Sequence, residues 1–268
     1  MTVAGPMPLE YLRRVWALRH FWLALVGNDI RHRYRRSLLG VGWSLVRPVA
    51  MTAVFCAVFG ALFHRDVGEY APYVLIGMVT WQLLHESLML GCHSFSQGAA
   101  YIRQQQVPHA IFPLRTVLGS GFHFAVALAV GIALAIFCRG VTAWLPLLFL
   151  PVAFVMLLLL CWSLAIVAGV TATHFPDASH LLEIALQILF YLTPIMYDPA
   201  DLPQRSGLTE VVGYNPIYAM LEWIRAPLLR GELPAVQSIA IGVGFTAATG
   251  LLAWILMRRL EKTLVFWL

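Results

Sequence analysis

The chain has 268 residues, of which 60% are hydrophobic and only 12% charged, and its mean hydropathy is +0.77. A soluble globular domain has about 45–50% apolar and about 25% charged residues, so this composition excludes an ordinary soluble domain and a disordered chain. The four cysteines form no C-x-x-C pair, and we expect neither a disulfide framework nor a metal site. The composition predicts a polytopic membrane protein.

Residues 1–40 form an N-terminal arm before the first long apolar stretch. Its arginines interrupt any apolar run long enough for a signal peptide. At 100° per residue, an apolar stripe faces one side and charged residues face the other. The arm therefore predicts an amphipathic helix whose stripe either lies on the membrane surface or packs against the protein's own helices. The stripe consists of Tyr11, Val15, Leu18, Trp22 and Leu25.

Six apolar stretches are long enough, or nearly so, to cross a bilayer core of about 30 Å as helices. Lipid offers no partner for an unpaired backbone group, and the pattern lacks the alternation of a barrel, so the spans are expected to be helical. The predicted fold is an all-α polytopic membrane protein, with an arm (1–40) and a six-helix transmembrane domain (41–268). The six spans cover residues 41–63, 70–90, 112–137, 143–170, 181–196 and 236–257.

Two connections are longer than a simple turn. Residues 91–111 are predicted to be a loop with a short polar helix, Ala99 to Gln106, stopped by Pro108. Residues 197–234 are too apolar for a free loop, and Asn215-Pro216 is an N-cap and N1 pair that begins a helix. That helix is too short to span, so the pattern predicts a re-entrant hairpin between spans five and six.

The basic residues predict an orientation. With six spans, 12 of the 18 Lys and Arg residues fall on the side that holds both termini, and five fall on the other side. Arg47 lies inside the first span and completes the count. The positive-inside rule therefore places both termini in the cytoplasm.

Several kinds of catalytic or nucleotide-binding motif are absent from the sequence. The only lysine, Lys262, follows no glycine-rich loop, so the chain is not expected to bind ATP as a P-loop does. Ser120 and His123 lie on one predicted helix, whereas a serine nucleophile needs its histidine base on a facing helix. Small Ser and Gly residues are better interpreted as helix-packing positions. We expect the chain not to be an enzyme.

Polar residues inside the spans are costly and are therefore functional candidates. Arg47 lies in span one, His85 and Glu86 in span two, and Glu183 in span five. Either carboxylate is a possible partner for Arg47. The group is interpreted either as contacts between helices or as the polar mouth of a conduit. No series of acidic residues crosses the membrane centre, which argues against a proton- or sodium-coupled transporter.

Aromatic residues form a second group. Phe55, Phe59 and Phe63 lie along one face of span one. They are interpreted either as part of an interfacial aromatic belt or as a lining on which sugar rings stack. The same two interpretations apply to Tyr191, Tyr197, Tyr214 and Tyr218.

Four strings in their order and spacing carry a resemblance to a known family: NDIRHRYRRSLLGVGWSLVRP (28–48), PHAIFPLR, YLTPIMY (191–197) and YNPIYAMLEWIRAPLLRG (214–231). The chain resembles, over essentially its whole length, permease subunits of ATP-binding-cassette (ABC) exporters for polysaccharides such as O-antigen, teichoic acid and capsule. Asp177 resembles the short acidic loop of that family, but Phe175-Pro176 replaces the usual arginine before it.

The resemblance implies a channel for lipid-linked polysaccharide in the bacterial inner (plasma) membrane, built from two copies of the chain. A separate ATPase subunit would dock beneath each copy and would bind ATP and Mg, so this chain itself would need no cofactor. Segment 94–107 would be the coupling helix in contact with the ATPase. The alternatives are an ABC permease for a drug or lipid, or a membrane-embedded lipid-modifying enzyme. The implied coupling residues are Ala99, Tyr101, Arg103, Gln104 and Gln105.

The resemblance also implies that the arm borders a gate admitting the lipid-linked end of the glycan. The forked donors of arginine suit the phosphate of a lipid carrier, whereas the alternative role of these arginines is membrane anchoring. The implied gate residues of the arm are Arg31, Arg33, Tyr34, Arg35 and Arg36.

Overall fold

The computed structural model describes residues 8–35, 37–60, 66–105, 107–140, 143–199, 212–264 and residue 267. Across these residues all regular secondary structure is helical, which confirms the all-α prediction. In chain order the helices are α1 (Pro8–Ala17), α2 (Arg19–Tyr34), α3 (Trp43–Phe55), α4 (Val67–Gln104), α5 (Ile111–Arg139), α6 (Trp144–Leu147), α7 (Leu150–His174), α8 (Ala178–Leu192), α10 (Pro216–Arg225) and α11 (Val236–Leu264).

Short turns of other helical types extend this set. A 3₁₀ turn, Gly40–Gly42, leads into α3, and a π-helical turn, Cys56–Gly60, continues it. A second π-helical turn, Ala226–Arg230, follows α10 and ends at Gly231, whose φ of 68° is left-handed. Glycine adopts this conformation without steric cost, so the chain can reverse there toward α11.

The described residues contain five helical segments that are long and apolar enough to cross a membrane: Gly40–Gly60, Val67–Gln104, Ile111–Arg139, Trp144–His174 and Val236–Leu260. These match five of the six predicted spans. The other predicted span is α8, an apolar helix of 15 residues. At 1.5 Å per residue it is about 22 Å long, shorter than a bilayer core of about 30 Å. The predicted count of six spans is therefore not confirmed.

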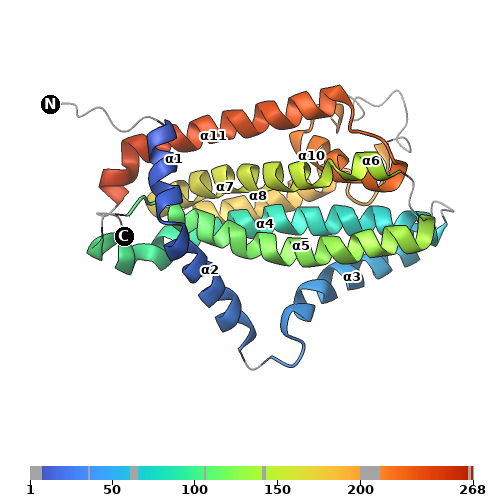
Figure 1. Ribbon diagram of the computed structural model, residues 1–268, viewed down its shortest axis with the longest axis horizontal. Coiled ribbons are helices and arrows are strands. Elements are labelled where there is room, and N and C mark those ends of the chain that lie inside the picture. The colour runs from blue at the N-terminus through green and yellow to red at the C-terminus, as the bar shows by residue number, and fades with distance from the viewer. Residues whose placement is uncertain are drawn as a thin grey trace.

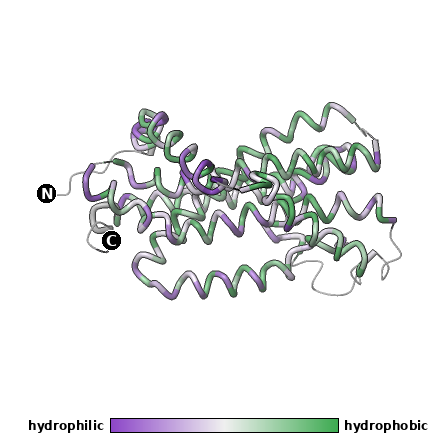
Figure 2. Tube along the Cα trace, turned by 90° about the horizontal axis from the view of Figure 1, so that it is seen from below, coloured by the Kyte–Doolittle hydropathy of each residue, from purple (hydrophilic) through white to green (hydrophobic). Residues whose placement is uncertain are grey.

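The long helices α4, α5, α7 and α11 lie roughly along one axis, whereas α1 stands across it and α2 and α3 are oblique to it (Figure 1). Helix α1 and the last turns of α4 and α11 lie at one end, which we call the terminal end. Helices α6 and α10 lie at the other, which we call the α10 end. Figure 2 shows hydrophobic residues along the middle of the helices and hydrophilic residues gathered toward the terminal end. This pattern is the one expected of helices that cross a lipid layer.

Helix α4 is the centre of the bundle and packs against α5 and α7. Small residues bring α4 and α7 together: a Cβ added at Gly91 would lie 2.8 Å from Cα of Ala165, and one at Gly169 would lie 2.7 Å from the carbonyl oxygen of Gly91. Such close backbone approach is typical of membrane helices that associate through small side chains. The glycines therefore fix the distance between the two central helices.

The predicted loop at residues 91–111 is largely wrong, because α4 is continuous to Gln104. One face of this extension stays buried: Gly91, Phe95 and Ile102 are inside the protein, while His93, Ser96 and Gln97 between them are exposed. This buried face holds residues 91–104 in the helix despite their polar composition. The helix ends before Pro108, as expected, since proline cannot continue it.

The arm forms two helices, α1 and α2, that separate at Leu18. Most of its apolar stripe packs against the protein. Tyr11, Val15 and Trp22 belong to one buried cluster with residues of α4, α5, α7 and α11. The indole of Trp22 also donates a hydrogen bond of 3.1 Å to the carbonyl oxygen of Val15 and so holds the two arm helices together.

Candidate functional site

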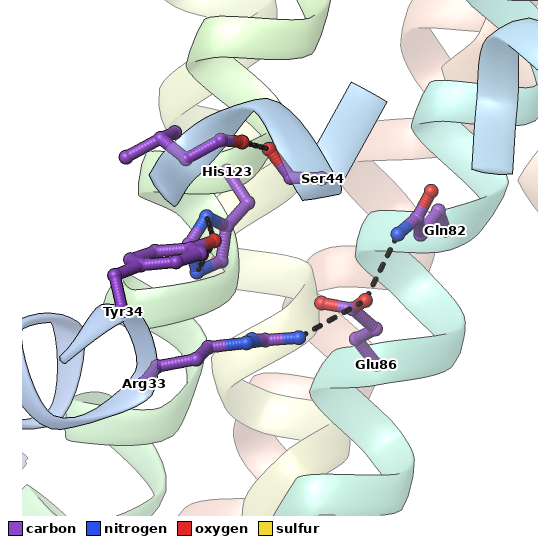
Figure 3. Close-up of polar contacts among 7 residues, drawn as sticks. Arg33, Tyr34, Ser44, Gln82, Glu86 and His123 are labelled. Carbon is purple, nitrogen blue, oxygen red and sulfur yellow. Dashed lines mark hydrogen bonds and ion pairs between the residues drawn. The ribbon is translucent and has the colours of Figure 1, made fainter. Parts of the chain in front are cut away.

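The first part of the candidate site is the place where the arm meets the bundle, shown in Figure 3. We call it the arm junction, and four helical elements contribute to it. Its residues are Arg33 and Tyr34 at the end of α2, Ser44 at the start of α3, Gln82 and Glu86 on α4, and His123 on α5.

Tyr34 binds the arm to α5. Its hydroxyl shares a hydrogen bond of 3.0 Å with Nδ1 of His123, and the two rings meet edge to face at 5.5 Å. Burial raises the pKa of Tyr34 above its ordinary value, so the phenol stays neutral and keeps its proton for this bond. One turn earlier on α2, Asp29 accepts two hydrogen bonds from the guanidinium of Arg115. The last two turns of α2 are thus fixed to α5 at two points.

Arg33 connects the arm to α4. Its guanidinium lies 3.9 Å from Oε1 of Glu86, and Gln82 donates a hydrogen bond of 2.9 Å to the same oxygen (Figure 3). The carboxylate of Glu86 therefore pairs with Arg33, and Arg47 makes no ion pair with Glu86 or Glu183 among the described residues. The choice of partner depends on where α2 returns to the bundle, which no local pattern indicates.

The second part of the candidate site is a cleft of about 380 Å³ between α3, α4 and α8, which we call the polar cleft. It brings together all four predicted polar membrane residues. Gln82 and Glu86 belong to both the arm junction and the polar cleft, so the two parts are directly connected. The polar cleft is lined by Arg47, Met51, Met78, Trp81, Gln82, His85, Glu86, Glu183, Leu186, Gln187, Phe190 and Tyr191.

The described members of the predicted aromatic lining lie in different parts of the structure. Tyr191 is 62% exposed and lines the polar cleft, where its neighbour Phe190 packs edge to face on Trp81. Phe55 and Phe59 lie near each other, with ring centroids 5.9 Å apart, and both pack against the main core. Phe63 and Arg36 lie outside the described residues.

The remaining predicted aromatics lie at the connection between α8 and α10. Tyr214 is exposed, and Tyr197 and Tyr218 are partly buried. Asn215 caps α10 as expected, since its Oδ1 accepts a hydrogen bond of 2.9 Å from the amide of Ile217. Residues 200–211 of the predicted hairpin lie outside the described residues.

The sequence reasoning missed Arg225, which it counted only as an outer charge. Arg225 is completely buried in the last turn of α10. Its guanidinium donates hydrogen bonds to the carbonyl oxygens of Pro194 (2.7 Å), Ile195 (2.8 Å) and Tyr73 (3.1 Å), and it lies 3.7 Å from the centre of the Tyr73 ring. It thereby joins α10, α4 and the turn after α8. An arginine inside the apolar string WIRAPLL was the signal available in the sequence.

The predicted coupling residues form the end of α4. Tyr101 packs edge to face on Phe21 of the arm, at 5.7 Å, and stacks on Phe112 of α5, at 6.4 Å. Arg103, Gln104 and Gln105 are exposed at the terminal end, and Ala99 is partly buried. Gln106 lies outside the described residues. The exposed end of α4 is therefore braced by both the arm and α5.

Within the described part of the chain, no group of three or more histidine, cysteine or acidic side chains is placed to hold a metal ion. The fold and the site together define an α-helical membrane protein with an open polar cleft between α3, α4 and α8. Comparison with known proteins gives the family. The model of the ABC-2 type transporter family matches residues 20–229, and the chain belongs to this family.

Curated relatives cover most of the chain. An O-antigen export system permease protein RfbA of Klebsiella pneumoniae is 24% identical over 212 residues, which are 79% of this chain and 81% of that protein. The protein of the same name in Myxococcus xanthus is 22% identical over 249 residues, 92% of this chain and 93% of that protein. The polysialic acid transport protein KpsM of Escherichia coli is 22% identical over 255 residues, 90% of this chain and 94% of that protein.

Proposed function

We propose that the chain is the channel subunit of an ABC exporter that moves lipid-linked polysaccharide across the bacterial inner membrane. Two copies would form the path, and a separate ATPase subunit would hydrolyse ATP. Family membership and the names of three relatives support this proposal. The observation that carries it is the polar cleft, because it offers hydrogen-bonding and aromatic side chains to a sugar chain within an otherwise apolar bundle.

The exposure of the polar cleft supports a dimer. Arg47, Glu183 and Gln187 are exposed on α3 and α8, and exposing such side chains to lipid is costly. A second copy packed against this face would remove them from lipid and enclose the cleft as a conduit. The terminal end would then be cytoplasmic, with the exposed residues of α4 available to the ATPase. The α10 end would lie at the outer exit.

The arm junction supports a gate at the entry to this path. Arg31 and Arg35 are exposed, and Arg33 remains about half exposed while it contacts Glu86. These side chains would attract the phosphate of a lipid carrier through charge-assisted hydrogen bonds. Because Glu86 contacts Arg33 and also lines the polar cleft, movement of the arm would change the position of a side chain in the path.

The experiment is complementation of a bacterium that lacks its own permease but keeps the ATPase and the glycan pathway. Surface glycan is measured with Gln187→Leu or Tyr191→Ala in the chain. We expect both variants to lower surface glycan several-fold while insertion in the membrane stays normal. Ile184→Ala is the matched control, since Ile184 is exposed on the same helix but does not line the cleft.

Two outcomes would contradict the proposal. If the wild-type chain restores no surface glycan together with its cognate ATPase, it is not the exporter's channel. If the cleft variants export as well as Ile184→Ala, the path does not run through the polar cleft. Replacing Arg33 and Arg35 with Gln tests the gate separately, by export and by stimulation of the ATPase.

A further inference from the structure

A second cavity of about 320 Å³ lies away from the polar cleft, between α1, α7 and α11. Its walls are almost entirely apolar, so it suits a hydrocarbon chain and not a sugar. The residues that define it include Leu12 on α1, Leu159 and Ile166 on α7, and Gly250, Trp254 and Met257 on α11. We call it the arm groove.

The length of the arm groove matches one leaflet of a bilayer. Its α11 residues run from Thr246 to Met257, which corresponds to about 16 Å of helix. Half of a bilayer core of about 30 Å is about 15 Å. The arm groove therefore extends from the headgroup level at the terminal end to about the middle of the membrane.

Positive charge is concentrated where the arm groove reaches the terminal end. Arg258 and Arg259 are exposed immediately after Met257, and Arg13 is exposed one residue after Leu12. The guanidinium of Arg258 lies 5.4 Å from the ring centre of Trp254, a residue of the groove wall. Glu10, the acidic residue of α1, pairs with Arg14 at 2.8 Å, so it neutralises the charge of Arg14 and not that of Arg13. The described charges of the rim, Arg13, Arg258 and Arg259, are therefore positive.

We propose that the arm groove is a binding site for an anionic phospholipid, with an acyl chain in the groove and the phosphate beside Arg258. Basic residues next to a membrane attract anionic headgroups with about 1 kcal/mol each. The lipid contacts both α1 and the α7–α11 pair, so it fastens the arm to the bundle. This site is separate from the polar cleft and does not depend on the transported substrate.

Native mass spectrometry of the purified full-length chain tests the proposal directly. The probes are 1-palmitoyl-2-oleoyl phosphatidylglycerol and the phosphatidylcholine with the same acyl chains. We expect the wild-type chain to retain one phosphatidylglycerol in preference to phosphatidylcholine. Arg258→Gln is expected to lower this preference about fivefold, the factor that corresponds to about 1 kcal/mol.

Gly250→Leu tests the groove itself, since a Cβ at Gly250 meets nothing within 4 Å and a leucine there fills the space. We expect it to lose the retained lipid, whichever headgroup is offered. Gly244→Leu is the matched control: Gly244 is also on α11 in open space but does not line the groove. It is expected to bind as the wild type does.

Either of two results would overturn the proposal. Equal retention of the two lipids by the wild-type chain would show that the chain has no site for an anionic headgroup. This comparison uses the wild-type chain alone, so it does not depend on the folding of a variant. Retention by a folded Gly250→Leu chain at the wild-type level would show that the lipid binds elsewhere. Both measurements concern lipid bound to the purified chain, so a failure of the export experiment would not affect them.

Discussion

The guanidinium of Arg225 occupies the space in which any residue other than glycine at position 77 would carry its Cβ. A Cβ at Gly77 would overlap Nη2 of Arg225 and would lie 3.0 Å from the carbonyl oxygen of Ile195. The glycine on α4 therefore makes room for a charged side chain of α10, 148 positions further along the chain, inside the membrane domain. The buried arginine and the glycine have to be considered together.

Gly77→Ala is expected to destabilise the protein, because the new methyl group displaces the Arg225 guanidinium from its three carbonyl oxygens. Overpacking of this kind typically costs about 1–3 kcal/mol. The midpoint of thermal unfolding in detergent measures the effect. Gly244→Ala, at a position with open space, is the control and should leave the midpoint nearly unchanged. Equal midpoints for the two variants would disprove the packing argument.

Arg225→Met is expected to be more damaging than Arg225→Lys. Methionine removes the guanidinium from three buried carbonyl oxygens, of which that of Pro194 keeps a hydrogen bond of 3.5 Å from the Tyr73 hydroxyl. Each carbonyl oxygen that stays unsatisfied costs about 1–3 kcal/mol. Lysine keeps the charge and three donors but loses the planar fork and the stacking on Tyr73. The order of unfolding midpoints should be wild type, Lys, then Met. A methionine variant as stable as the lysine variant would show that these hydrogen bonds contribute little.

Tyr34→Phe removes the hydrogen bond to His123 and keeps the edge-to-face contact of the rings. The expected loss of stability is about 1 kcal/mol, the usual net value of one hydrogen bond. A double-mutant cycle with His123→Leu isolates the pair, since both single changes and the double change should then cost similar amounts. Additive losses would mean that the two side chains do not act together.

Arg103→Ala and Gln104→Ala separate the proposed coupling role from stability. Both side chains are exposed at the end of α4, so each change should alter stability by no more than about 0.5 kcal/mol. Binding of the cognate ATPase subunit, measured by co-purification, should fall. Arg13→Ala, an exposed arginine of the arm at the same end, is the control. If both α4 variants bind the ATPase subunit as well as the wild type does, the end of α4 is not the coupling surface.

The long apolar helices could be predicted closely. The span expected at residues 143–170 is observed at Trp144–His174, and the one expected at 236–257 begins at Val236. The end of α4 could not be predicted, because the composition of residues 91–104 is that of a loop. This stretch stays helical only because Gly91, Phe95 and Ile102 are buried against neighbouring helices. The apolar stripe of the arm could be identified from the sequence, but not the helices against which it packs.

The polar residues of the candidate site were also identified without their partners. The sequence singled out Glu86 and Glu183 as candidates to pair with Arg47, whereas Glu86 pairs with Arg33. Tyr34 and His123 are 89 positions apart, and no spacing indicates that they meet. The most buried charge of the described residues, Arg225, received no role at all.

The sequence by itself determined that this is a helical membrane protein and where most of its long helices run. Lipid imposes length, hydropathy and backbone hydrogen bonding on each segment separately, so a local pattern is sufficient. The tertiary structure decided the partner of each polar side chain, the continuity of α4 and the packing of the arm. These features depend on groups far apart in the chain, whose cost of burial is offset only when the folded bundle brings them into contact.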